Sequence, residues 1–529
     1  MSKLDLHDIQ GNILKAYGRY FYPKARYACF GVTEADGARR FVQGLVTLVT
    51  TAAPWAAKGA ERHAKPESTV NVAFSYHGLR EIGVPRDSLQ SFPDEFAMGM
   101  KARMDILGDD GPSAPARWDP VWREREVHIL VWINGNSVAA IEQKYAEVAG
   151  IARGCPGVEL LRGHRGAGGR DDQDWQDASA IYADGQPTAR EHFGYTDGIS
   201  NPFFRGMPAS ESNVMGGGKV TGLPAQTGAG WEPLETGEFL LGYKDEAQEY
   251  PEAPSPTLLA RNGTFMVYRK LHQNVGAFDG YLERAGSTFP GGKEALAAKF
   301  AGRWRNGAPL TTFPTQAEAD TFAASWERAK GALAQAKTDR ERAEAKARLA
   351  DIGVKLTAFD YRGDIDGGRC PVGAHVRRAN PRGALEFAQR GAFDSPGALS
   401  NRRRILRRGL PYGDSRERTD DGDHGIVFLA MNASIRRQFE FVQQQWMNYG
   451  NDFGLANDKD PLVGNHGAVG GDGGLPGGRM TIQTGASDPN PPYFCAGIPR
   501  FVETRGGDYF FLPSLTALRM IGDGSIDPT

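Results

Sequence analysis

Apolar residues recur at roughly every second position in three segments of the first part of the chain: RYACFGV (26–32), STVNVAFSY (68–76) and REVHILVWI (125–133). This alternation, together with the β-branched and aromatic residues in these segments, predicts β-strands. The stretch 137–154 has helical spacing instead, with Ser137 as a candidate N-cap and Gly154 as a stop. The first part of the chain is therefore expected to alternate strands with helices.

The same alternation returns later in the chain. NGTFMVYRKL (262–271) and GIVFLAMNA (425–433) have the composition of strands, and an amphipathic helix is expected at 434–450. A last strand is expected at 508–514. Two regions with the same alternation of strands and helices predict an α+β fold of two ferredoxin-like units, each an antiparallel sheet with peripheral helices.

We place the two units at 1–230 and 231–529. Residues 203–236, rich in Gly, Pro and polar residues, are expected to form a long loop between them. Residues 316–350 form a helical insertion, whose apolar stripe consists of Phe322, Trp326, Ala329 and Leu333. This insertion is either a solvated helical segment packed by one face, or a lid or oligomer contact.

Composition and charge narrow the function classes. The chain of 529 residues has 62 Lys and Arg against 64 Asp and Glu, a formal charge of −2, which gives no reason to expect nucleic acid or a charged membrane as a partner. No apolar run is long enough to span a bilayer, and the start of the chain, MSKLDLHDIQGNIL, lacks the features of a secretory signal, so a cytoplasmic location is expected. The four cysteines form no C-x-x-C pair, so zinc, iron–sulfur clusters and covalent haem attachment are not favoured.

Three segments place reactive side chains among residues that restrict the backbone. In FGYTDGISNP (193–202), Gly194 and Gly198 flank Asp197 and allow a tight turn that could aim its carboxylate into a cavity. Asp before Gly is also a common turn with no chemical role. From these residues alone, both interpretations of Asp197 stay open.

The second segment, CPVGAHVRRANPR (370–382), holds His375 close to Arg377, Arg378 and Arg382. A neutral imidazole can ligate iron, and nearby guanidinium groups can pair with haem propionates. A single histidine can equally be a packed core or surface residue. The third segment, RRRILRRGLPYG (402–413), embeds a basic run among apolar residues, so at least one arginine is expected to point inward and to need an anion.

Together these segments resemble the dye-decolourising peroxidases. Asp197 falls on the Asp of the family's G-x-x-D-G motif, His375 on its proximal histidine in C-P-x-x-A-H-x-R-x-x-N-P-R, and Arg407 on its distal arginine in I-L-R-R-G-x-P-Y-G. Further landmarks occur in family order over nearly the whole chain: DIQGNIL, GMKARMDILGDDGPSAP, LARNGTFMVYRKL, AAKFAGRWRNGAPL, RRQFEFVQQQW and FVETRGGDYFFLPS. The chain resembles the longer branch of the family, and the insertion at 316–350 departs most from the pattern.

The resemblance implies a peroxidase that binds one haem b per chain, mainly in the C-terminal unit. Hydrogen peroxide and an organic electron donor, such as a dye or a phenol, are the implied partners, while a homo-oligomer and the use of manganese stay open. His375 is the implied axial iron ligand, Asp197 the acid–base group and Arg407 the group that stabilises developing charge. The alternative is a haem-binding or haem-transfer protein with incidental peroxidase activity.

Other residues are assigned to the same site as expectations. Asp460 in KDPLVG is our candidate for the carboxylate behind His375, and Asp452 is the reserve. Tyr412 and Trp446 are candidate surface oxidation sites. Further contacts with the cofactor are expected from Arg377, Ile199, Asn380, Ile426 and Phe428; the last two lie two apart on a predicted strand and would share one face, as a roof of the pocket or as ordinary core.

Overall fold

The computed structural model describes residues 4–18, 21–55, 64–166, 169–208, 214–221, 230–385, 397–467, 477–485 and 488–527. Within these ranges one large antiparallel sheet has the strand order β11-β12-β10-β15-β2-β3-β1-β4, and β5 also pairs with β1. Its strands are β1 (Lys24–Val32), β2 (Ser68–Phe74), β3 (Ile129–Gly135), β4 (Val158–Leu160), β5 (Gln176–Ser179), β10 (Thr264–Gln273), β11 (Leu406–Tyr412), β12 (Gly425–Asn432) and β15 (Val502–Leu512).

The sheet has an N-terminal and a C-terminal half. Strands β1 to β5 form one half and β10, β11, β12 and β15 form the other, and they join where Phe511 of β15 pairs with Phe74 of β2. Strand β11, at one end of the sheet, also contacts β5, at the other, so the sheet curls toward a barrel. The predicted α+β class with antiparallel strands is confirmed. The division of the chain at residue 230 stays a prediction.

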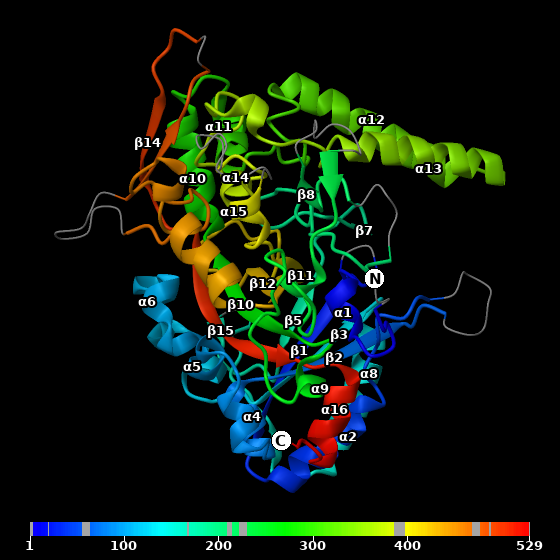
Figure 1. Ribbon diagram of the computed structural model, residues 1–529. Coiled ribbons are helices and arrows are strands. Elements are labelled where there is room, and N and C mark those ends of the chain that lie inside the picture. The colour runs from blue at the N-terminus through cyan, green and yellow to red at the C-terminus, as the bar shows by residue number, and fades with distance from the viewer. Residues whose placement is uncertain are drawn as a thin grey trace.

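Helices cover the outside of this sheet (Figure 1). Helices α2 (Ala35–Val46), α8 (Val138–Arg153) and α16 (Leu515–Asp523) pack together near the N-terminal strands, and α10 (Val275–Gly286) packs on α11 (Gly292–Ala301) at the other end of the molecule. The predicted N-cap of α8 is confirmed, since the Ser137 hydroxyl accepts from the Ala140 amide at 3.2 Å. The helix expected at 434–450 instead consists of two π-helical segments, η8 (Arg436–Glu440) and η9 (Val442–Met447).

The predicted insertion is a pair of helices, α12 (Gln316–Gln335) and α13 (Asp339–Val354), which lie side by side and project from the rest of the molecule (Figure 1). Each helix begins with a capping box, Thr315 with Glu318 and Thr338 with Glu341, and the second box is the reason that the helical pattern breaks in two. The apolar stripe is confirmed as the packed face, since Phe322 and Ala329 are buried while Trp326 and Leu333 are half-buried.

The remaining described α-helices and strands are short. They are α1 (Gly11–Leu14), α3 (Tyr76–Ile82), α4 (Arg86–Gln90), α5 (Asp94–Ala102), α6 (Met104–Leu107), α7 (Pro120–Arg123), α9 (Thr257–Ala260), α14 (His375–Ala379), α15 (Ala398–Asn401), β6 (Tyr182–Ala183), β7 (Gln186–Pro187), β8 (Lys219–Val220), β9 (Trp231–Glu232), β13 (Gly478–Ile482) and β14 (Tyr493–Ile498). The expected long loop at 203–236 includes the pair β8 and β9, and its residues 209–213 and 222–229 lie outside the described ranges. None of the helices described is long and apolar enough to cross a membrane.

Candidate active site

One face of β11 and β12 is only partly covered by other side chains. Gly409 of β11 pairs with Phe428 of β12, and Pro411 pairs with Ile426, so both of these apolar side chains share a face with Arg407. Ile426 and Phe428 are half-buried, whereas the alternate positions, Val427 and Leu429, are fully buried. The predicted shared face of Ile426 and Phe428 is thereby confirmed, and it leaves accessible apolar surface beside Arg407.

Arg407 contacts Asp197 on this face, although the two residues lie 210 positions apart in the chain. Nη1 of Arg407 is 3.2 Å from Oδ1 of Asp197, and its Nη2 donates to the carbonyl of Ile199 at 2.9 Å. The side chains keep 35% and 40% of their exposure, so both can still meet a small ligand. The structure therefore brings together the two polar residues that the sequence assigned to one site.

His375 begins α14 and forms a hydrogen bond with Asp460. Its Nδ1 lies 2.9 Å from Oδ2 of Asp460, whose other oxygen accepts from the amides of Leu462 and Val463 at 2.9 Å each. Asp460 is fully buried while the His375 side chain is 31% exposed, which leaves Nε2 as the ring nitrogen available to a ligand. Burial lowers the pKa of His375, but the Asp460 carboxylate outweighs it, so the net pKa is raised.

His375 lies near the ion pair of Asp197 and Arg407. The positive charge of Arg407 lowers the pKa of His375 and the negative charge of Asp197 raises it, so both groups are close enough to act on the imidazole. The structure thus brings the three residues assigned from the sequence into one region, and Arg407 shares its face of the sheet with Ile426 and Phe428.

Three buried arginines, Arg303, Arg382 and Arg404, lie near these residues. Arg382 belongs to the segment of His375 and Arg404 to that of Arg407, whereas Arg303 lies outside both. Arg303 donates to the carbonyls of Gly307 and Leu356, and Arg404 to those of Gly217 and Gly218. Arg382 donates to two carbonyls and, at 2.8 Å, to the Ser200 hydroxyl, three residues after Asp197.

Within the described part of the chain, these three arginines donate to carbonyl and hydroxyl oxygens, and none of them forms an ion pair with a carboxylate. Burial and the positive charges of their neighbours lower the pKa of both Arg303 and Arg404 to about 9. Buried cations of this kind are costly without an anion. An anionic ligand bound beside them would remove that cost. Sequence reasoning did not single out Arg404, because a basic run alone does not tell which arginine turns inward, and it missed Arg303, because that residue lies outside the segments assigned to the site.

Asp452 and Arg377 have other partners than expected. Asp452 accepts from Nε1 of Trp446 at 3.1 Å, so Asp460, and not Asp452, is the carboxylate that contacts His375. Arg377 is buried, and its guanidinium donates to the carbonyls of Asp364, Ile365 and Cys370. Its donors hold the backbone that precedes His375, and its expected contact with the cofactor stays a prediction.

The two candidate surface oxidation sites are wrong. Tyr412 and Trp446 are each only 1% exposed. Tyr412 lies on the opposite face of β11 from Arg407, beneath Lys270 at 4.8 Å from its ring, and Trp446 packs between Phe441 and Phe453. Asn380, in contrast, has a buried Oδ1 that finds no partner in the described part of the chain, which is compatible with contact to a ligand.

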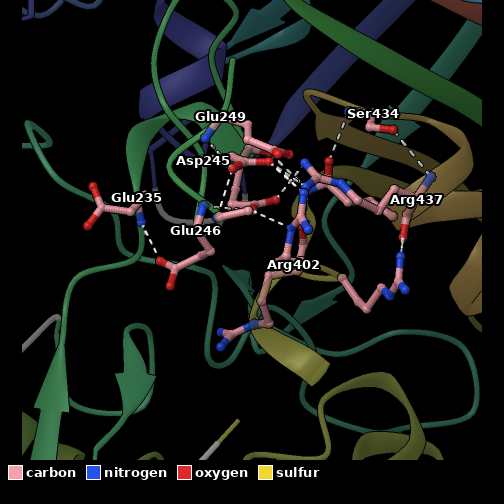
Figure 2. Close-up of polar contacts among 12 residues, drawn as sticks. Glu235, Asp245, Glu246, Glu249, Arg402, Ser434 and Arg437 are labelled. Carbon is pink, nitrogen blue, oxygen red and sulfur yellow. Dashed lines mark hydrogen bonds and ion pairs between the residues drawn. The ribbon is translucent and has the colours of Figure 1, made fainter. Parts of the chain in front are cut away.

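A network of buried charges fixes the segment that leads into β11 (Figure 2). Asp245 accepts from Arg402 at 2.8 Å and from Arg437 at 2.6 Å, and Arg437 also reaches Glu238 at 3.0 Å. Burial raises the pKa of Glu238 to about 7, against the effect of Arg437. Because Arg402 lies five residues before Arg407, this network fixes the start of the strand that carries the site arginine.

Comparisons with known proteins give one consistent result. Residues 8–157 match the family described as "DyP dimeric alpha+beta barrel domain", and residues 393–461 match "Dyp-type peroxidase, C-terminal". A dye-decolorizing peroxidase of Mycena epipterygia is 28% identical over 540 residues, covering 98% of this chain and 87% of that protein. The multifunctional dye peroxidase DyP2 of an Amycolatopsis strain is 26% identical over 544 residues, an alignment that covers 98% of this chain and 96% of DyP2. The solved structure of an ancestral D-type dye decolorizing peroxidase superposes with a TM-score of 0.68 at 25% identity, covering 98% of this chain and 99% of that one.

Proposed function

Because the chain belongs to the dye-decolourising peroxidase family, whose members depend on haem, we propose that it uses haem b to reduce hydrogen peroxide and takes electrons from dyes, phenols or similar donors. The observation that carries this proposal is the placement of His375, with Nδ1 held by Asp460, near the ion pair of Asp197 and Arg407.

The residues on this face suit a haem. His375 would ligate the iron through Nε2, and the half-buried Ile426 and Phe428 would pack on the porphyrin. The buried arginines without carboxylate partners, Arg303, Arg382 and Arg404, would balance the propionates. When bound, the haem supplies the iron that takes oxidising equivalents from the peroxide and passes them to the donor.

Asp197 is the acid–base group in this proposal. Its carboxylate takes the proton from the inner oxygen of hydrogen peroxide and delivers it to the outer oxygen, which leaves as water. Arg407, 3.2 Å away, stabilises the negative charge that grows on the departing oxygen. Both side chains are partly exposed, so a small peroxide can reach them.

Asp460 orients the proximal imidazole. Its buried carboxylate accepts the Nδ1 proton of His375, which fixes the tautomer and makes Nε2 a stronger electron donor. The two amides that bind its other oxygen prevent the carboxylate from rotating away.

The test is the visible spectrum of the purified holoprotein before and after one equivalent of hydrogen peroxide, followed by turnover with a dye and with a phenol. The proposal predicts a haem Soret band, its displacement by peroxide and steady turnover, with His375→Ala losing the axial-ligand signature. A strong haem band without turnover would favour the haem-binding alternative, and no haem band after reconstitution would contradict the proposal.

A further inference from the structure

Backbone amides of the loop that carries Asp197 donate to a buried carboxylate, that of Glu191. Glu191 is 8% exposed, and its two oxygens accept from the amides of Phe193 and Tyr195, at 2.8 Å each. The turn is closed by a hydrogen bond from the Gly194 amide to the Glu191 carbonyl at 2.8 Å, and Gly194 has φ +92°, a conformation that favours glycine. The path of the backbone from 191 to 195 is therefore set by the Glu191 side chain.

Glu191 also accepts a hydrogen bond from the sheet. Nε2 of Gln273, at the end of β10, donates to it at 2.6 Å. Burial raises the pKa of Glu191, while Gln273 and the two amides oppose that shift, so these three donors are what compensates the burial of a charge.

Two further sets of hydrogen bonds connect the same loop to its surroundings. The carbonyl of Arg305 accepts from the amide and the hydroxyl of Thr196, at 3.0 and 2.9 Å. The guanidinium of Arg305 donates to the Phe193 carbonyl. His192 contacts the carbonyl of Tyr412, on β11, through Nε2 at 2.8 Å. Since β11 also carries Arg407, these contacts fix the Asp197 loop relative to the partner of Asp197.

We propose that Glu191 is a positioning residue for the peroxide reaction: it holds residues 192–197 so that the Asp197 carboxylate stays against Arg407. The inference rests on the proposed function, since it assigns Glu191 a role through the acid–base group of that reaction. In Glu191→Gln the amide has one acceptor oxygen and a donor group, so it cannot satisfy all three donors that the carboxylate accepts. The loop is then free to shift while the core and the haem-binding face are unchanged.

The experiment compares the holoprotein with four variants: Glu191→Gln, Asp197→Asn, the double variant, and Glu283→Gln as a matched control. Glu283 lies on α10, is 64% exposed and pairs with Lys293. The rate constant for reaction with hydrogen peroxide is measured by stopped flow. Hydrogen exchange of peptides covering 192–198 is followed by mass spectrometry.

Glu191→Gln should lower the peroxide rate constant about 10- to 100-fold, because displacement of a reacting group by about 1 Å costs this much. It should also speed exchange of the 192–198 amides and leave the haem spectrum unchanged, and Glu283→Gln should match the wild type in all three. In the Asp197→Asn background the same substitution should have little further effect, since the group it positions is gone.

An equal fold-loss in both backgrounds would show a structural effect that does not pass through Asp197, and would overturn the inference. So would a wild-type rate in Glu191→Gln. If that variant does not fold, Gln273→Met removes one of the three donors and keeps the carboxylate, and a smaller loss with the same dependence on Asp197 is expected. A wild-type protein that fails to react with peroxide would contradict the proposed function itself, a result distinct from these.

Discussion

Replacing Asp460 with asparagine tests the proximal side of the site most directly. The carboxylate uses one oxygen for two backbone amides, of Leu462 and Val463, and the other for Nδ1 of His375. An asparagine has a single acceptor oxygen. If the asparagine oxygen keeps its bonds to the two amides, the asparagine NH₂ group faces Nδ1 of His375, and Nδ1 must then accept a hydrogen bond. The proton of the neutral ring therefore moves to Nε2, where it blocks ligation. If the oxygen faces His375 instead, the NH₂ group meets two amide donors.

The size of the effect follows from these bonds. In either orientation at least one hydrogen bond to a charged acceptor is lost, at about 1.5–3 kcal/mol, which corresponds to a weakening of haem affinity by about 10- to 150-fold. Second-sphere carboxylates of metal-bound histidines have effects of about 10- to 100-fold on affinity, in the same range. Asp460→Asn should therefore bind haem clearly more weakly while the fold is kept.

The assay is titration of the apoprotein with haem, followed by Soret absorbance and by competition with a second haem-binding protein. Asp452→Asn is the matched control, because Asp452 lies eight residues away, bonds to Trp446 at 3.1 Å and does not contact His375. The control should bind haem as the wild type does. Equal affinity of the Asp460 and Asp452 variants would refute the assignment of Asp460, and a loss in both would point to a general effect on the segment.

Three further predictions concern catalysis and stability. Asp197→Asn should slow the reaction with hydrogen peroxide by roughly 10²–10⁴ with haem retained, and stopped-flow rates equal to the wild type would remove Asp197 from the mechanism. Lys270→Met should lower the free energy of unfolding by about 3–5 kcal/mol, measured in urea, because Lys270 and Asp119 form a fully buried pair at 2.9 Å. Burial raises the pKa of Glu238 from 4.5 to about 7, so its contribution to stability is complete below pH 4.5 and is lost as pH rises through 7. Glu238→Gln should remove up to about 3 kcal/mol of this decline between acidic and neutral pH, and an unchanged pH dependence of urea unfolding would contradict it.

The strands rich in apolar residues were predictable because β-branched and aromatic side chains pack in the core. The segment 125–133 is an example: β3 is buried at every position, and its β-branched and aromatic residues stand out in the sequence. Strand β11 was not predicted, because its two arginines interrupt the run of apolar residues that is typical of a buried strand. Arg407 faces Asp197, while Arg408 turns to the other side of the strand and donates to the carbonyls of Asn12 and Ile13. Arginines that find buried acceptors pack like core residues, and composition alone does not show this.

The candidate site could be predicted where a motif fixed the residue, and not where a distance along the chain was the only guide. Asp452 and Asp460 differ by eight positions, and only the turn that binds the Asp460 carboxylate directs its free oxygen toward His375. Tyr412 could be excluded only with β11 identified as a strand, which the sequence did not predict. It lies five residues after Arg407, and an odd spacing on a strand places two side chains on opposite faces. Once β11 is known to be a strand, Tyr412 must face the core, as its 1% exposure shows.

The choice between the two adjacent arginines of β11 depends on the register of one strand. A slip by one residue would exchange the faces of Arg407 and Arg408 and bring the wrong guanidinium to Asp197. Gly409 prevents such a slip. It has φ +117°, and a Cβ at that position would lie 1.9 Å from the carbonyl oxygen of Val427 on β12. Neither Arg408 nor Leu410 could occupy this position, so the glycine between them fixes the register and thereby selects Arg407 as the residue that meets the Asp197 carboxylate.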